Sequence, residues 1–207
     1  RLKRLRFEPS YHVEWILDLV IENKWEPHTF DIIDRYLPTH GLFIDIGAWC
    51  GMFTMYAAQK AQHIWAVEPD PEARRLLTVN MAYNQIHNVT VVPEAIWCHD
   101  QGMTLYSHDG IFGSSMTGPT RKGDPLVVPT ITPGQLRDKI GVEPNLVKVD
   151  TEGSESEFLD ELLTVFNCPI LLSLHEAEQI HPVNIHTISR SVIRLNDIDS
   201  YAEYLIL

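Results

Sequence analysis

The chain has 207 residues, a formal net charge of −12, 44% hydrophobic residues and 21% charged residues. This length suits one α/β domain and excludes two domains of ordinary size, and the hydrophobic content excludes a disordered chain. The negative charge repels a phosphate backbone, so we expect a small-molecule or glycan partner and no nucleic acid.

The first part of the chain has the periodicity of helices. Apolar residues recur on one helical face over residues 11–22, and a second short helix is expected from Pro27 to Leu37, where Pro38 ends it. We therefore predict a helical N-terminal extension over residues 1–39. Residues 40–207 form the single main domain.

Short apolar strands then alternate with helices. Strands are expected at 42–46, 64–67, 89–92, 146–150, 170–174 and 204–207, and helices at 52–62, 71–84, 133–140, 155–166 and 184–195. Residues 95–98 extend or follow the third strand. The stretch from 100 to 129 is rich in glycine and serine and predicts hairpins, with strands at 103–107 and 126–129. The alternation predicts a doubly wound, mostly parallel sheet of the Rossmann-like α/β class.

The cysteine content and the apolar runs bear on the location of the protein. Cys50, Cys98 and Cys168 are widely spaced and form no C-x-x-C pair, which is typical of a reduced, cytoplasmic protein. No apolar run reaches the roughly 20 residues that span a bilayer, and we see no secretory signal. The sequence opens without methionine, so we expect a fragment or a trimmed chain.

A glycine turn follows the first strand of the main domain. The residues from Asp45 to Gly51 form the pattern D-x-G-x-x-x-G, in which Gly47 and Gly51 allow a tight turn and close approach to a ligand. The pattern differs from the dinucleotide fingerprint G-x-G-x-x-G. Asp45 would repel a phosphate but suits an ammonium or hydroxyl group.

Glu68 follows the second strand, about 20 residues after the glycine turn, where a ribose-binding acid belongs. Its carboxylate can accept hydrogen bonds from both ribose hydroxyls. The alternative is an acid that only stabilises the start of the next helix. The turn and the acid occur together at the spacing of one nucleotide-binding fold, which favours the first interpretation.

A third polar group follows the strands expected at 146–150 and 170–174. Lys148 and Asp150 point to the same side because side chains alternate along a strand. They can form a structural ion pair, since unpaired buried charges are unfavourable. The functional interpretation places Asp150 and Glu152 in the cleft, with His175 from the next strand beside them.

These motifs together resemble the FkbM-type methyltransferases over about residues 40–176. The resemblance rests on 43–48 with Gly51, on Val67-Glu68-Pro69, on Asn84, on Gly113-Ser114-Ser115, and on Val147-Lys148-Val149-Asp150-Thr151-Glu152-Gly153 with Glu155. It implies the class I methyltransferase fold, S-adenosylmethionine as donor and an oxygen acceptor, often a hydroxyl on a sugar or a natural product.

The resemblance also assigns residues. Asp45, Gly47 and Gly51 would line the methionine part of the cofactor, with Ala48 in the same turn. Glu68 would hold the ribose, and Glu94 and Ala95 would lie beside the adenine. Asp150, Glu152 and His175 would face the transferred methyl group. Asp150 would also contact the cofactor.

The chain departs from the family pattern at two places. The bulky pair Trp49-Cys50 replaces small or polar residues in the glycine turn, and Ser173 stands where a glutamate is expected. The chain also stops at Leu207, so we expect a last strand of the fold to be missing.

An alcohol acceptor must lose its proton as its oxygen attacks the methyl group. We expect a near-neutral His175 to be the base, with Asp150 as the second candidate. Alternatively, Asp150, Glu152 and His175 hold a divalent ion such as Mg or Mn, although we expect no metal. The stretch from 100 to 129, with His108, Phe112 and Ser114, is expected to shape the acceptor pocket.

Three other functions are compatible with the fold. An NAD-dependent oxidoreductase is disfavoured by the missing dinucleotide fingerprint, and an RNA methyltransferase by the acidic charge. The third is a non-catalytic nucleotide-binding or interaction module in which Trp49 fills the cofactor cleft.

Overall fold

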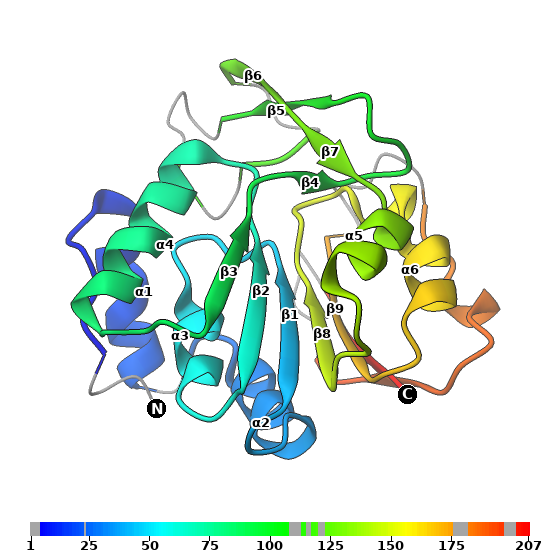
Figure 1. Ribbon diagram of the computed structural model, residues 1–207, viewed down its shortest axis with the longest axis horizontal. Coiled ribbons are helices and arrows are strands. Elements are labelled where there is room, and N and C mark those ends of the chain that lie inside the picture. The colour runs from blue at the N-terminus through cyan, green and yellow to red at the C-terminus, as the bar shows by residue number, and fades with distance from the viewer. Residues whose placement is uncertain are drawn as a thin grey trace.

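The structure, a computed structural model, describes residues 5–22, 24–107, 113–114, 117–119, 123–175, 182–196 and 202–207. A seven-stranded sheet runs through the molecule in the order β10-β11-β9-β8-β1-β2-β3 (Figure 1). Its strands are β1 (Leu42–Ile46), β2 (His63–Val67), β3 (Val89–Val92), β8 (Leu146–Val149), β9 (Ile170–Leu174), β10 (Val192–Arg194) and β11 (Ala202–Ile206). β1, β2, β3, β8 and β9 pair in parallel, whereas β11 is antiparallel to both of its neighbours. The Rossmann-like, mostly parallel sheet is therefore confirmed.

The strand order reverses between β1 and β8. From β1 the chain builds outward through β2 and β3, and then crosses to β8 and β9 on the other side. Asp45 lies in register with Lys148, and Ile46 with Val149. In open α/β sheets ligands bind outside the carboxyl ends of strands at such a switch point, which places the site at the ends of β1 and β8.

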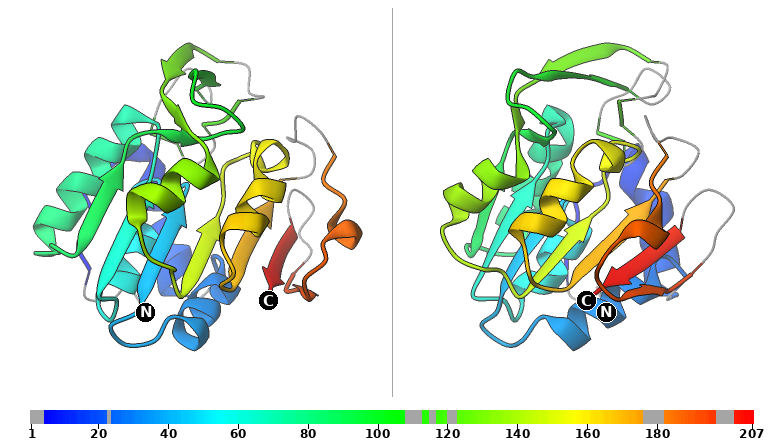
Figure 2. Two further views of the ribbon diagram at one scale, coloured as in Figure 1. Left: turned by 45° about the vertical axis from the view of Figure 1, so that its right-hand side comes forward. Right: turned by 90° about the vertical axis from the view of Figure 1, so that its right-hand side faces the viewer.

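Helices cover both faces of the sheet (Figures 1 and 2). One face packs against α1 (Tyr11–Ile21), α2 (Pro27–Tyr36), α3 (Met52–Ala58) and α4 (Pro71–Tyr83), and the other against α5 (Pro133–Ile140) and α6 (Leu159–Val165). The side chains of Ile16, Phe30 and Leu205 belong to the first core cluster, so the two N-terminal helices share a core with the sheet. None of the helices within the described ranges is long and apolar enough to cross a membrane.

Two small sheets lie beyond the carboxyl end of the main sheet, at the top of Figure 1. β4 (Ala95–Ile96) pairs in parallel with β7 (Thr130–Ile131), and β5 (Met103–Tyr106) pairs antiparallel with β6 (Pro125–Val128). The hairpin expected in the glycine-rich stretch is thus confirmed. It stands over the end of the sheet where the site is expected.

The predicted helix over 184–195 is wrong. The segment contains a short 3-10 helix, η3 (Ile185–Thr187), followed by β10, whose Val192 and Ile193 pair with Ile206 and Leu205 of β11. β-branched side chains favour an extended backbone, and β10 supplies hydrogen bonds to a strand edge that would otherwise be open.

The ends of three other elements also differ from the predictions. The strand predicted at 204–207 is β11, which starts two residues earlier and lies between β9 and β10. The helix predicted at 155–166 is divided into η1 (Glu155–Glu157) and α6, and α3 ends at Ala58 instead of residue 62. Helix ends fray and change type within a few residues, which sequence periodicity does not capture.

Candidate active site

The loops that follow β1 and β8 touch through their backbones. A Cβ atom on Gly47 would lie 1.8 Å from the carbonyl oxygen of Asp150, and Gly47 has a φ of 78°. The Gly47 and Ala48 N–H groups donate to the Val67 carbonyl at 2.9 and 3.1 Å. Glycine is therefore required at position 47 both for its conformation and for the close approach of Asp150.

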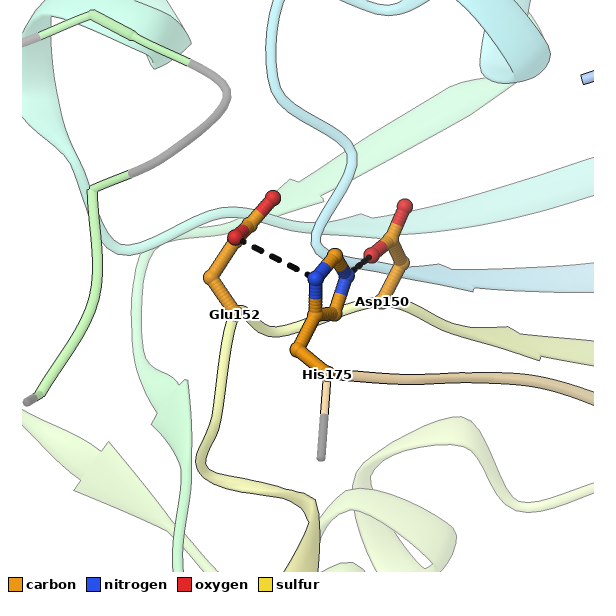
Figure 3. A group of neighbouring side chains, drawn as sticks. All are labelled: Asp150, Glu152 and His175. Atoms are coloured by element: carbon orange, nitrogen blue, oxygen red, sulfur yellow. Dashed lines mark hydrogen bonds and ion pairs between the residues drawn. The ribbon is translucent and has the colours of Figure 1, made fainter. Parts of the chain in front are cut away.

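Asp150, Glu152 and His175 meet at the carboxyl ends of β8 and β9. The imidazole of His175 lies between the two carboxylates, as Figure 3 shows. His175 Nε2 is 2.9 Å from Asp150 Oδ1, and His175 Nδ1 is 3.5 Å from Glu152 Oε2. One ligand atom from each residue lies within 4.8 Å of the others. We call these three residues the carboxylate–imidazole cluster; the sequence analysis placed them together.

The two carboxylates change the protonation of this cluster. Burial lowers the pKa of His175 because it disfavours the charged imidazole. The hydrogen bond and charge of Asp150 outweigh this effect, as does the charge of Glu152, and the pKa of His175 is raised to about 9. Burial also disfavours the Asp150 carboxylate, but Lys148 and His175 outweigh it and hold the pKa of Asp150 below its ordinary value. His175 is therefore mainly an imidazolium at neutral pH, unlike the near-neutral base that the sequence analysis expected.

Glu155 fixes the loop that carries Glu152. Its Oε1 accepts hydrogen bonds from the Thr151 N–H at 2.8 Å and the Thr151 hydroxyl at 2.9 Å, and its Oε2 accepts from the Gly153 N–H at 3.1 Å. Glu152 itself has a φ of 54°, which is rare for a residue with a side chain. Sequence analysis gave Glu155 no role, although it completes the pattern K-x-D-x-E-G-x-E that begins at Lys148.

A layer of buried polar groups lies behind the cluster. Lys148 is 1% exposed, and its Nζ is 3.0 Å from Asp150 Oδ2, so the predicted Lys–Asp pair exists. Burial lowers the pKa of Lys148, but Asp150, Asp45 and Glu26 outweigh it and raise that pKa above its ordinary value. Asp45 Oδ2 accepts a hydrogen bond from the Thr54 hydroxyl at 2.6 Å, while its buried Oδ1 has no partner among the described residues.

Two glutamates that the sequence analysis missed extend this layer. The Thr29 hydroxyl lies 2.8 Å from Glu203 Oε1 and 3.1 Å from Glu26 Oε2. A hydroxyl has a single proton to donate and cannot serve two ionised carboxylates. Burial and the nearby Asp150 raise the pKa of Glu26 to about 8, so Glu26 carries the proton at neutral pH. Glu26 comes from the start of α2 and Glu203 from β11, and no local motif marks either residue.

Glu68 lies at the end of β2, beside the glycine turn. Its Oε2 accepts the Trp49 backbone N–H at 2.8 Å, and its Oε1 accepts the Asp70 N–H at 2.9 Å. Burial raises the pKa of Glu68 to about 7, although both hydrogen bonds oppose this. Each carboxylate oxygen has two lone pairs, so a further hydrogen bond can be accepted at both.

The remaining predicted residues lie around this edge of the sheet. Glu94 forms an ion pair with Lys139 at 2.9 Å, and its buried Oε2 has no partner in the described part of the chain. Ala95 is buried in β4, packed with Leu105 and Val128. Ser114 is buried, whereas His108 and Phe112 lie outside the described residues.

Comparison with known families settles the class of protein. The methyltransferase FkbM domain matches residues 45–198. The chain belongs to the FkbM methyltransferase family. It is thus an S-adenosylmethionine-dependent methyltransferase and not an NAD-dependent oxidoreductase. No curated protein gives a significant match to the sequence.

Solved structures share the fold of this methyltransferase at low sequence identity. A candidate methyltransferase from Streptococcus mutans in complex with SAH is 10% identical, with a TM-score of 0.54 over 87% of this chain and 95% of that chain. An rRNA methylase from Streptococcus thermophilus is 9% identical, with a TM-score of 0.52 over 86% and 92%. The precorrin-6y C5,15-methyltransferase from Geobacter metallireducens is 14% identical, with a TM-score of 0.50 over 87% and 84%. These similarities support the class I methyltransferase fold and leave the acceptor open.

Proposed function

We propose that this protein transfers the methyl group of S-adenosylmethionine to a hydroxyl oxygen of a sugar, a glycan or a small natural product. The observation that carries the proposal is the imidazole of His175, held between two carboxylates at the end of the sheet where the glycine turn meets the loop after β8. This arrangement can accept and hold a proton. Methylation of a hydroxyl requires such a proton acceptor, whereas methylation of the free base of an amine does not.

The residues at the switch point fit the donor. The buried Oδ1 of Asp45, without a partner among the described residues, suits an ammonium group such as that of the methionine part. The free lone pairs of Glu68 suit the two ribose hydroxyls. We assign Gly47, Ala48 and Gly51 to the methionine side of the site, and Glu94 and Ala95 to the adenine side. When bound, the donor supplies a methyl group on a positively charged sulfur.

The carboxylate–imidazole cluster supplies the proton chemistry. Only the neutral form of His175 accepts the acceptor's proton, and the two carboxylates then stabilise the imidazolium that results. Because the pKa of His175 is about 9, a small fraction of the enzyme is ready at neutral pH. Asp150 is a weaker base because its pKa is held low. Its role is to orient His175 through the 2.9 Å contact.

The same three side chains also fit a divalent cation. Two carboxylates and one imidazole, with ligand atoms within 4.8 Å of one another, are a donor set that Mg or Mn accepts. Such an ion would supply positive charge beside the acceptor oxygen. The proposed proton transfer to His175 does not need it, so activity should survive treatment with EDTA.

The acceptor is tested by transfer of labelled methyl groups to a panel of sugars, glycosides and phenols. The proposal is supported if the protein methylates a hydroxyl and if His175→Ala lowers the rate of this transfer by about 100-fold or more while retaining its affinity for S-adenosylmethionine. Transfer only to amines or to RNA, or equal turnover by His175→Ala, contradicts it. Rates measured with EDTA and with added Mg²⁺ distinguish the base from the metal alternative.

A further inference from the structure

Trp49 is a bulky residue in the glycine turn, at a position where the sequence analysis expected a small or polar one. It has a left-handed backbone with a φ of 48°, an unfavourable conformation for so large a residue. Its side chain is 8% exposed. The backbone N–H donates to Glu68 Oε2 at 2.8 Å, and the indole N–H donates to the Gly113 carbonyl at 2.8 Å. One residue therefore links the proposed ribose ligand to a segment far along the chain.

Asp70 holds Gly113 from the other side. Asp70 Oδ2 accepts the Gly113 N–H at 2.6 Å, and the Asp70 N–H donates to Glu68 Oε1 at 2.9 Å. Four hydrogen bonds thus close a ring through Glu68, Trp49, Gly113 and Asp70, which we call the Glu68 ring. All four bonds are buried, so water competes little for their donors and acceptors, and a shift of one member strains the next.

Thr117 and Gly118 lie between Asp70 and the carboxylate–imidazole cluster. A Cβ atom on Gly118 would lie 2.6 Å from the Glu152 carbonyl oxygen and 3.3 Å from the Glu152 Cβ. Gly118 is also paired with Tyr106 of β5, and the Thr117 hydroxyl donates to Asp70 Oδ2 at 3.2 Å. Gly118 thus packs against Glu152, one of the three residues of the carboxylate–imidazole cluster.

We propose that Trp49 is a positioning residue: it fixes Gly113 and Gly118 as one wall of the acceptor pocket and couples that wall to the cofactor at Glu68. The inference rests on the proposed function and extends it to the acceptor side. The carboxylate oxygens of Glu68 already accept hydrogen bonds from the backbone N–H groups of Trp49 and Asp70. A ribose hydroxyl that donates to Glu68 would bind to the same two oxygens. Cofactor binding therefore adjusts the Glu68 ring, and the ring carries the change to Gly118 beside Glu152.

The test uses nuclear magnetic resonance of the ¹⁵N-labelled chain, with S-adenosylhomocysteine as the probe. In the parent protein we expect the Trp49 indole signal and the Gly118 amide signal to shift as the probe binds. Trp49→Phe keeps an aromatic ring but loses the N–H donor. In this variant the probe still binds, and the Gly118 shift is reduced, because only the path through Asp70 and Thr117 remains. Trp97→Phe is the matched control, since the Trp97 indole N–H donates to His99 at 3.2 Å outside the ring.

Two results overturn the inference. One is a Gly118 shift in Trp49→Phe equal to that of the parent, and the other is binding of the probe without a shift of the Trp49 indole signal. Absence of any probe binding to the parent overturns the proposed function, and this inference with it. If Trp49→Phe does not fold, Asp70→Asn opens the ring at the opposite side while its Oδ1 can still cap α4. This variant also weakens the contact with Thr117, so a reduced Gly118 shift is again required.

Discussion

His175 shows how neighbours decide the chemistry of a residue. A histidine at a strand end predicts a near-neutral base, but the carboxylates of Asp150 and Glu152 raise its pKa to about 9. Since only neutral imidazole accepts a proton, kcat/KM should rise about tenfold per pH unit from pH 6 and level off near pH 9. Asp150→Asn removes one of the charges that raise the pKa, so its plateau should begin at lower pH. A parent profile that is flat from pH 6 to 9 would rule out His175 as the base.

Glu26 predicts an effect on stability. Its pKa is 4.5 in the unfolded chain and about 8 when folded. Because the pKa of Glu26 is higher in the folded state, its contribution to the free energy of unfolding is full below pH 4.5. This contribution is lost as the pH rises through 8. Glu26→Gln cannot ionise, so it should gain stability relative to the parent between pH 5 and pH 9, on the order of 2–4 kcal/mol.

Urea unfolding of the two proteins at several pH values measures this gain. Because His175 titrates in both proteins, the difference between them isolates Glu26. Glu14→Gln, at an exposed position of α1, is the control and should follow the parent. Parallel stability curves for Glu26→Gln and the parent would show that Glu26 is already ionised at pH 5.

At the scale of elements, the contact between the loops after β1 and β8 holds the two halves of the site together. Gly47→Ala places a Cβ 1.8 Å from the Asp150 carbonyl at a φ of 78°. Backbone strain and overpacking should together lower the free energy of unfolding by about 2–4 kcal/mol. Gly141→Ala is the matched control: its φ is 73° with no atom within 4 Å, so strain alone should lower stability by about 1 kcal/mol. Equal losses in the two variants, measured by urea unfolding, would mean that the loops move apart freely.

Elements with strong local signals are predictable from the sequence. β1, β2 and the two helices capped by Asp70 and Thr132 lie where their signals place them, because those signals are local. β10 was missed because its extended conformation depends on pairing with β11, and no local pattern encodes that partner.

The site divides in the same way. The common location of Asp45, Glu68, Asp150, Glu152 and His175 is predictable from the sequence. Each lies near the carboxyl end of a strand, and parallel strands bring these ends to one edge. Glu26 and Glu203 reach the site by packing of α2 and β11, and Gly113 reaches Trp49 across 64 positions. The high pKa of His175 depends on distances that no spacing in the sequence provides.

For the whole molecule, the charge of −12 bears on the acceptor. A solved rRNA methylase has a similar fold, but at 9% identity the likeness concerns the fold alone. The overall field and the two carboxylates of the cluster both repel a phosphate backbone. We predict no RNA complex in a gel-shift assay at micromolar protein and physiological salt. A complex that weakens steeply with added salt would instead indicate a local basic surface and an RNA acceptor.

Calorimetric titration with S-adenosylmethionine, with NAD as the control, tests the central claim most directly. The account predicts micromolar binding of S-adenosylmethionine, loss of that binding in Glu68→Ala, and no heat from NAD. Absence of S-adenosylmethionine binding by the folded protein would contradict it, and would leave a fold in which Trp49 fills the cofactor cleft and the chain serves as an interaction module.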